Sequence, residues 1–367
     1  MNRISQLDSL RGIAVLGLLL LNSYYFALFE TGYVRPQVPV LSDQIIQYLN
    51  LLLLDSRFRT LFCMLFGAAL VIQFSKRNNI ESLKPRLIAI GIIGILHSIF
   101  VWPGDILLSY GIAGFLALSY LNANNQRVLH HGIALFFLSC TLLLLLSFTS
   151  TDEMISRQSA QFELLVTSAP SDLPSLLIHN VAMTAIMLLM LPILTLWNAL
   201  GLMLIGMYCF KKQIFTLGLN KAHLTLTISA IFILSATSIA LETIDGQKYA
   251  GINEALVWVN ALFGALLVTH LNAKISFGRV LLMPVQAVGK VALTCYLMQS
   301  FIMICYFVWL NPQARASYNR IDYVELAFVG IALQLLLAPL YTRYFTHGPF
   351  EYVLKHLSLK IAQRHKD

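Results

Sequence analysis

Two ionisable side chains, His97 and Asp105, lie in a stretch that otherwise consists of apolar and small residues, LHSIFVWPGDILLSYG (96–111). A carboxylate that hydrogen-bonds one ring nitrogen of a histidine fixes the tautomer and leaves the other nitrogen to act as a general base. The Trp-Pro-Gly sequence between them predicts a turn that permits this contact. Two structural roles compete with catalysis. Asp105 can cap the helix that follows, and His97 can be a buried imidazole that donates to a neighbouring helix.

The composition indicates that these side chains lie within lipid. Of 367 residues, 58% are hydrophobic and 11% charged, against about 25% charged in an ordinary soluble domain. The apolar stretches are about 20 residues long, which is enough to cross about 30 Å of hydrocarbon as helices. They lack the alternation of barrel strands, and backbone that faces lipid must be hydrogen-bonded within its own segment. The sequence therefore predicts an all-α, polytopic membrane bundle, a single integral domain over residues 1–367.

Ten candidate spans follow from the apolar runs. The sixth is 35 residues long, too long for one perpendicular helix, and Pro192 and Gly201 predict that it is tilted or broken. The spans are 9–30, 57–75, 85–102, 105–122, 127–148, 176–210, 222–243, 254–272, 284–310 and 322–345.

Three further segments are predicted to lie at the membrane surfaces. Residues 41–54 are too short to cross and predict an interfacial or re-entrant helix before the second span. Residues 152–170 mix acids and Arg157 with apolar residues, which indicates an amphipathic segment on the outer surface. Residues 346–367 form a cytoplasmic amphipathic helix and tail, in which Glu351 follows Gly-Pro and has a structural role at the helix start.

The distribution of basic residues orients the chain. With the N-terminus inside, 18 of the 25 Lys and Arg residues fall on the cytoplasmic side, whereas 13 of the 17 acids fall outside. Both termini are therefore expected in the cytoplasm, and the turn at 102–105 outside. This bias accounts for the net charge of +8 without a nucleic-acid partner.

The first span carries polar residues at both shallow and deep positions. Asp8 and Arg11 are three residues apart, so they share a helix face and can pair. Asn22 follows Arg11 by 11 residues, about 16 Å along a helix, which places it near the membrane centre. These residues can contact a substrate. Alternatively, the arginine snorkels and the asparagine joins two helices.

Other candidate binding residues are weaker. Arg57 and Arg59 are predicted to face the outer surface beside Asp55, where they could bind an anionic acceptor or form a salt bridge. The ninth span carries polar side chains that suit either a cavity wall or helix–helix hydrogen bonds, namely Thr294, Tyr296, Gln299 and Ser300. The five cysteines have no paired spacing, and no metal site is predicted.

Several blocks resemble known families. Leu-Asp-x-x-Arg-Gly-Ile-Ala (7–14), followed by Asn22, resembles the opening of the transmembrane acyltransferases. The heparan-α-glucosaminide N-acetyltransferases have Asn at that later position, whereas acyltransferase-3 proteins usually have His. Four further blocks resemble, in order, the YeiB-type bacterial inner-membrane family. They are FRTLFCMLFG (58–67), LHSIFVWPGDILLSYG (96–111), VGKVALTCYLMQS (288–300) and HGPFEYVLKHLS (347–358).

The resemblance implies an acyltransferase of the bacterial inner membrane. An acyl-CoA such as acetyl-CoA would dock as co-substrate near Arg11, with no tightly bound cofactor. The acyl group would pass to a hydroxyl or amine of an extracytoplasmic, glycan or lipid-linked acceptor, with His97 as base and Asp105 as its orienting residue. One departure is that the active histidine of the glucosaminide acetyltransferases lies between the first two spans, where this chain has none.

Two other function classes stay open. Ten spans, a broken sixth span and polar groups near mid-membrane are also typical of a transporter or permease for a small solute or lipid. A non-catalytic lipid-binding or assembly protein would share the same composition.

Overall fold

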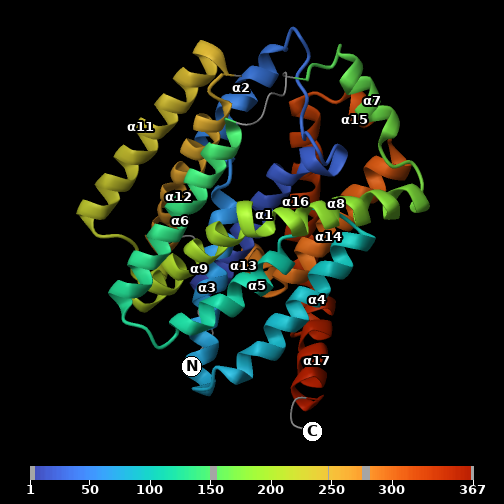
Figure 1. Ribbon diagram of the computed structural model, residues 1–367. Coiled ribbons are helices and arrows are strands. Elements are labelled where there is room, and N and C mark those ends of the chain that lie inside the picture. The colour runs from blue at the N-terminus through green and yellow to red at the C-terminus, as the bar shows by residue number, and fades with distance from the viewer. Residues whose placement is uncertain (1–4, 149–154, 247, 275–281, 365–367) are drawn as a thin grey trace.

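The computed structural model describes residues 5–148, 155–246, 248–274 and 282–364, and over these ranges the chain forms helices and turns without a strand (Figure 1). The helices are α1 (Ser5–Ala27), α2 (Leu41–Leu49), α3 (Arg57–Arg77), α4 (Lys84–Phe100), α5 (Leu107–Ala117), α6 (Asn125–Ser147), α7 (Ala160–Ser168), α8 (Leu173–Leu194), α9 (Leu196–Lys211), α10 (Ile214–Leu217), α11 (Lys221–Asp245), α12 (Ala250–Lys274), α13 (Met283–Lys290), α14 (Ala292–Cys305), α15 (Ala314–Ser317), α16 (Arg320–Tyr344) and α17 (Pro349–Arg364).

The predicted membrane fold is confirmed. Within the described residues, nine helical segments are long and apolar enough to cross a membrane. Two shorter apolar segments, Leu107–Tyr120 and Leu196–Lys211, complete the pattern, the first as the predicted fourth span. The start of α1 lies beside the end of α12, where Ser9 Oγ donates to Asn272 Oδ1 over 2.6 Å. In Figure 1, both this end of α1 and the end of α17 lie in the lower part of the molecule.

The sixth span is two helices that meet at Thr195. Pro192 lies in the last turn of α8, where its ring removes one backbone donor and interrupts the hydrogen-bond ladder. Figure 1 shows α8 lying across the bundle, and α9 continuing from it at an angle. Gly201, in contrast, does not bend the chain. It lies inside α9, where a Cβ would come within 2.7 Å of the Phe136 amide nitrogen in α6.

The predicted surface segments have structural anchors. Residues 41–54 form α2 and a π-helical turn, and the Asp43 carboxylate accepts from the Arg320 amide at the start of α16 and from the Tyr33 hydroxyl. Within 152–170, residues 152–154 lie outside the described part and α7 follows. Arg157 ties this segment to the α1–α2 loop by donating to the Val34 carbonyl over 2.9 Å. Within 346–367, α17 forms as expected, and residues 365–367 are not described.

At four glycines, where α1 crosses α13 and α3 crosses α9, two helix backbones come into direct contact. A Cβ at Gly67 of α3 would overlap the Met203 carbonyl oxygen of α9, and a Cβ at Gly206 of α9 would overlap that of Met64. Gly12 of α1 and Gly289 of α13 have the same relation to Val285 and Asp8, the latter through its backbone oxygen. Close contacts between small residues are a main source of helix association in lipid, where there is little hydrophobic drive. These crossings therefore fix the positions of α1, α3, α9 and α13 relative to one another.

Candidate functional site

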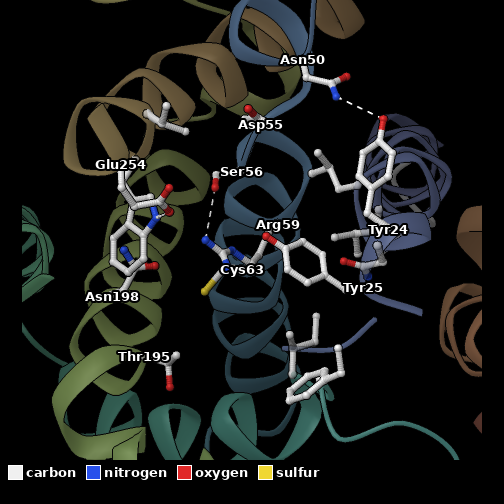
Figure 2. A pocket seen from close by; sticks show the side chains of 18 of the residues that line it. Tyr24, Tyr25, Asn50, Asp55, Ser56, Arg59, Cys63, Thr195, Asn198 and Glu254 are labelled. Carbon is white, nitrogen blue, oxygen red and sulfur yellow. Dashed lines mark hydrogen bonds between the residues drawn. The ribbon is translucent and has the colours of Figure 1, made fainter. Parts of the chain in front are cut away.

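A cavity of about 580 Å³ lies in the half of the bundle opposite these glycine crossings. The end of α1, the start of α3, the α4–α5 turn, the α8–α9 break and the start of α12 form its wall, and Arg320 of α16 contributes as well. Figure 2 shows the side chains that converge on it from α1, α3, α9 and α12. Its inner edge is formed by Cys63 and Leu202, which directly precede the Met64 and Met203 contacts of the α3–α9 crossing. The crossing therefore bounds the cavity.

The wall carries seven formally charged groups. The cations are Arg35, Arg59 and Arg320, and the anions are Asp55, Asp105, Glu242 and Glu254. One ion pair is internal to the wall, because Arg35 Nη2 lies 2.6 Å from Glu242 Oε1, which also accepts from Gln47 over 2.7 Å. Glu254 Oε1 accepts from the indole nitrogen of Trp258 over 2.8 Å.

Aromatic rings surround the arginines of the cavity. The Arg59 guanidinium lies 5.6 Å from the ring centre of Trp258, on the α12 side. The Arg320 guanidinium lies 4.4 Å from the ring centre of Tyr33 and 5.6 Å from that of Tyr24. Cations over aromatic faces keep favourable electrostatic contacts where water is scarce. Neither guanidinium group has a carboxylate partner within 4 Å in the described part of the chain.

The expected contact between His97 and Asp105 is present. Nδ1 of His97 lies 2.8 Å from Oδ2 of Asp105, and both side chains are almost fully buried. The same carboxylate also caps α5, since Oδ1 accepts from the Leu107 amide over 2.7 Å. The Tyr296 hydroxyl of α14 donates to Oδ2 over 3.4 Å. Asp105 therefore serves both as the predicted cap and as the partner of His97, and it links three helices.

The second ring nitrogen of His97 differs from the first. Nε2 is buried and has no hydrogen-bond partner among the described residues. A buried polar atom without a partner is uncommon and marks a place where a water, proton or ligand atom is needed. Asp105 forms part of the cavity wall, whereas His97 lies behind that wall and does not line the cavity. The catalytic role of the two residues stays a prediction.

The other predicted residues divide between the cavity and the bundle interior. Asn22 and Arg59 line the cavity. Arg57 is not on the outer surface as expected, because its side chain is buried, donates to the Leu51 carbonyl over 3.2 Å and packs against Gly264. Arg57 and Arg59 are two residues apart on one helix, so their side chains point about 200° apart around the helix axis and cannot share one face.

The remaining candidates contact other side chains of the bundle, away from the cavity. Arg11 pairs with Asp8 over 3.0 Å near the start of α1, away from the cavity wall. Thr294 Oγ1 donates to Glu351 Oε2 over 2.5 Å, which joins α14 to α17. Gln299 donates to the Gln334 side chain of α16 over 3.0 Å. For Thr294, Tyr296 and Gln299, the helix–helix alternative therefore describes the observed contacts.

The sequence analysis did not single out Arg320 or Glu254 as site residues. Each lies within one turn or two of the start of its helix, where a charged residue at an interface is ordinary. Only the packing of α12 and α16 around α1 and α3 shows that both reach one cavity. Within the described part of the chain, no three His, Cys, Asp or Glu side chains gather in a way that could hold a metal ion.

Comparisons with known proteins agree with this architecture. Residues 209–360 match a family described as protein of unknown function (DUF418). The uncharacterized protein YeiB of Escherichia coli K12 is 25% identical, over 99% of this chain and 98% of its own length. The uncharacterized protein YxaH of Bacillus subtilis 168 is 24% identical, over 96% and 93%. No solved structure matches the chain. The relatives align over nearly the whole chain and residues 209–360 match the family model, so the chain is a multi-pass membrane protein that is similar to the YeiB-type proteins.

Proposed function

We propose that the protein is an acyltransferase of the bacterial inner membrane. It would move an acyl group from a cytoplasmic acyl-CoA to a hydroxyl or amine of an extracytoplasmic or lipid-linked acceptor. The observation that carries the proposal is the hydrogen bonding of His97. Its Nδ1 is hydrogen-bonded to Asp105, whereas its buried Nε2 has no partner among the described residues. That is the arrangement a general base needs before its substrate binds.

The proposed reaction uses one proton transfer and one acyl transfer. Nε2 of His97 takes the proton of the acceptor hydroxyl or amine as the acceptor atom forms a bond to the thioester carbonyl carbon. The carbon–sulfur bond then breaks, and the proton leaves with the CoA thiolate as CoA-SH. Asp105 stabilises the imidazolium that exists between these steps, because its carboxylate already accepts from Nδ1.

The geometry sets two requirements for this reaction. The acceptor must pass the wall formed by residues 103–106 to reach Nε2, because His97 lies behind it. The donor must approach from the cytoplasmic end, where Arg11 can present its planar fork to a phosphate once it leaves Asp8.

The decisive experiment measures acyl-CoA binding and transfer with purified protein in nanodiscs. Calorimetry with acetyl-CoA and longer acyl-CoAs is expected to detect binding, and labelled acyl-CoA should acylate a membrane acceptor. His97→Gln should abolish transfer while binding persists, whereas His130→Gln, an exposed histidine near the start of α6, should change neither. Arg11→Lys should weaken binding by about 1.5–3 kcal/mol, since the charge stays but the bidentate contact is lost. Absence of binding at millimolar acyl-CoA would overturn the proposal.

A carrier for a small polar solute is the second candidate, and the break between α8 and α9 favours it. Met190, Thr195 and Asn198 line the cavity on both sides of this break. Carriers often place discontinuous helices at substrate sites near mid-membrane. Failure to bind acyl-CoA, combined with solute uptake by proteoliposomes, would establish this function instead.

A further inference from the structure

The charges of the cavity wall do not all find partners within the protein. Arg35 pairs with Glu242, and Asp105 pairs with His97. Two arginines, Arg59 and Arg320, have no carboxylate within 4 Å in the described part of the chain. Two carboxylates, those of Asp55 and Glu254, likewise have no Lys, Arg or His within that distance there. Two positive and two negative groups thus remain available around one space.

These four groups converge on the cavity from different helices. Asp55 lies two residues before α3 and Arg59 in its first turn, whereas Glu254 comes from α12 and Arg320 from α16. In Figure 2, Glu254, Asp55 and Arg59 surround the same opening, with Tyr24 and Tyr25 on the side of α1. Nε of Arg320 is buried and has no hydrogen-bond partner among the described residues. Because the Arg320 guanidinium lies over the rings of Tyr24 and Tyr33 and has no carboxylate within 4 Å among the described residues, an acceptor from a ligand would not have to displace a protein anion.

The sign of the charges restricts the ligand. A simple anion would pair with the arginines but be repelled by the two carboxylates, and a simple cation would meet the reverse problem. A neutral sugar would supply hydrogen bonds but leave all four charges without counter-charges, which is costly for the partly buried Asp55 and Arg320. A ligand that carries one negative and one positive group satisfies both sets.

The side chains also indicate the chemistry of the two groups. An arginine guanidinium group binds phosphate through two parallel hydrogen bonds, and two such groups can bind the same phosphate. An ammonium is stabilised by carboxylates and by the faces of aromatic rings, and Tyr25 lies in the same wall. Leu18, Leu21 and Met187 supply apolar surface beside these groups, which suits the start of a lipid chain or a glycerol unit.

We propose that the cavity binds a phosphate–ammonium zwitterion, with the phosphate between Arg59 and Arg320 and the ammonium toward Asp55 and Glu254. Such a group occurs in the headgroup of an ethanolamine phospholipid and in its soluble glycerophosphodiester. The further idea that the amine of this zwitterion is the acyl acceptor rests on the proposed acyltransferase function. As a binding property, the inference is independent of acyl transfer.

The test measures binding to purified protein in detergent free of ethanolamine lipids and without acyl-CoA. The probes are glycerophosphoethanolamine and dihexanoyl phosphatidylethanolamine, compared with inorganic phosphate, ethanolamine and glucose. At least one zwitterion should bind about tenfold more tightly than phosphate or ethanolamine alone, because it satisfies both charge sets. Binding of both zwitterions would indicate a soluble ligand, and binding of only the phospholipid would indicate a headgroup. Equal binding of phosphate, ethanolamine or glucose, or no binding of either zwitterion, would overturn the inference.

Variants separate the two ends of the zwitterion. Arg320→Gln should weaken zwitterion binding by about tenfold, and Arg320→Lys should weaken it less. Glu254→Gln should also weaken zwitterion binding but strengthen phosphate binding, since one repulsive charge is removed. Arg343→Gln, an exposed arginine at the far end of α16, is the matched control and should change nothing. Thermal melting of each variant checks its fold. If Arg320→Gln does not fold, Glu254→Gln still tests the inference, because it should change zwitterion binding and phosphate binding in opposite directions.

Zwitterion binding without acyl transfer would leave this inference standing while the acyltransferase proposal fails. Acyl transfer to another acceptor, without zwitterion binding, would give the opposite result.

Discussion

The two halves of the bundle are packed in different ways. In the half that contains the α1–α13 and α3–α9 crossings, glycines bring backbone against backbone and leave no room for a Cβ. In the opposite half, aromatic rings and guanidinium groups line a cavity of about 580 Å³. The helices α1 and α3 belong to both halves, so each of them changes along its length from close packing against α13 or α9 to lining the cavity.

This difference shows how a membrane bundle can hold charged groups in its interior. The glycine crossings fix the positions of the helices without any polar contribution, because close packing alone associates helices in lipid. The polar side chains at the other ends of these helices are then free to face a ligand instead of one another. Each prediction below tests one side of this comparison.

The first prediction concerns which half faces outward, and its effect is all-or-none. Val38, in the α1–α2 loop beside the cavity half, is 85% exposed, and Asn79, after α3, is exposed in the other half. A cysteine at position 38 should react with a membrane-impermeant maleimide in intact cells, whereas one at position 79 should react only after permeabilisation. The unchanged protein, in which four of five cysteines are buried, gives the background. The reverse pattern would contradict the orientation derived from the basic residues.

The second prediction tests the tight half. Gly67→Ala should destabilise the protein by about 3 kcal/mol, the upper end of the usual cost of overpacking, because its Cβ meets the Met203 carbonyl and rigid backbone cannot give way. Thermal melting in detergent measures the effect. Gly91→Ala is the matched control, since its Cβ would meet only Leu108 Cδ1 at 3.7 Å. Equal melting temperatures for the two variants would show that the crossing does not hold the bundle together.

The third prediction concerns the edge of the cavity. Asp105→Ala should cost about 1–3 kcal/mol for each buried group that it leaves unpaired, which here includes His97 Nδ1 and the Leu107 amide. Asp105→Asn keeps an acceptor for the amide and should lose less stability, yet it should still lower acyl transfer because the imidazolium loses its counter-charge. If both variants transfer acyl groups at the wild-type rate, Asp105 acts only as a helix cap.

The smallest expected effect is at the far end of the tight half, where α17 docks. Glu351 Oε1 accepts from the Leu293 amide over 2.9 Å, and Oε2 accepts from the Thr294 hydroxyl. Glu351→Ala should therefore cost about 0.5–2 kcal/mol, the usual effect of losing a helix cap, and should expose α17 to protease. Zwitterion binding should not change, because the cavity lies in the other half. A loss of binding would show that the two halves are coupled.

Much of the fold could be predicted from the sequence. The long apolar runs identify the crossings, since lipid admits only segments that satisfy their own backbone hydrogen bonds. Pro192 predicted a broken sixth span, and the break lies three residues after it, whereas Gly201 proved to be a contact site for α6. The His97–Asp105 contact was also predictable, because eight residues around a Trp-Pro-Gly turn bring two side chains close through local geometry alone.

What the sequence could not determine is which polar residues face one another across the bundle. Arg57 and Arg59 look alike in sequence, but the first is buried against Gly264 and the second lines the cavity. Arg320 and Glu254 lie 66 positions apart and reach the same space only because α12 and α16 both pack around α1 and α3. Hydrophobicity specifies that a helix crosses the membrane but says little about its rotation or its neighbours. Those were decided by tertiary packing, because the surrounding lipid is as apolar as the side chains and only close backbone contacts and polar pairs distinguish one helix face from another.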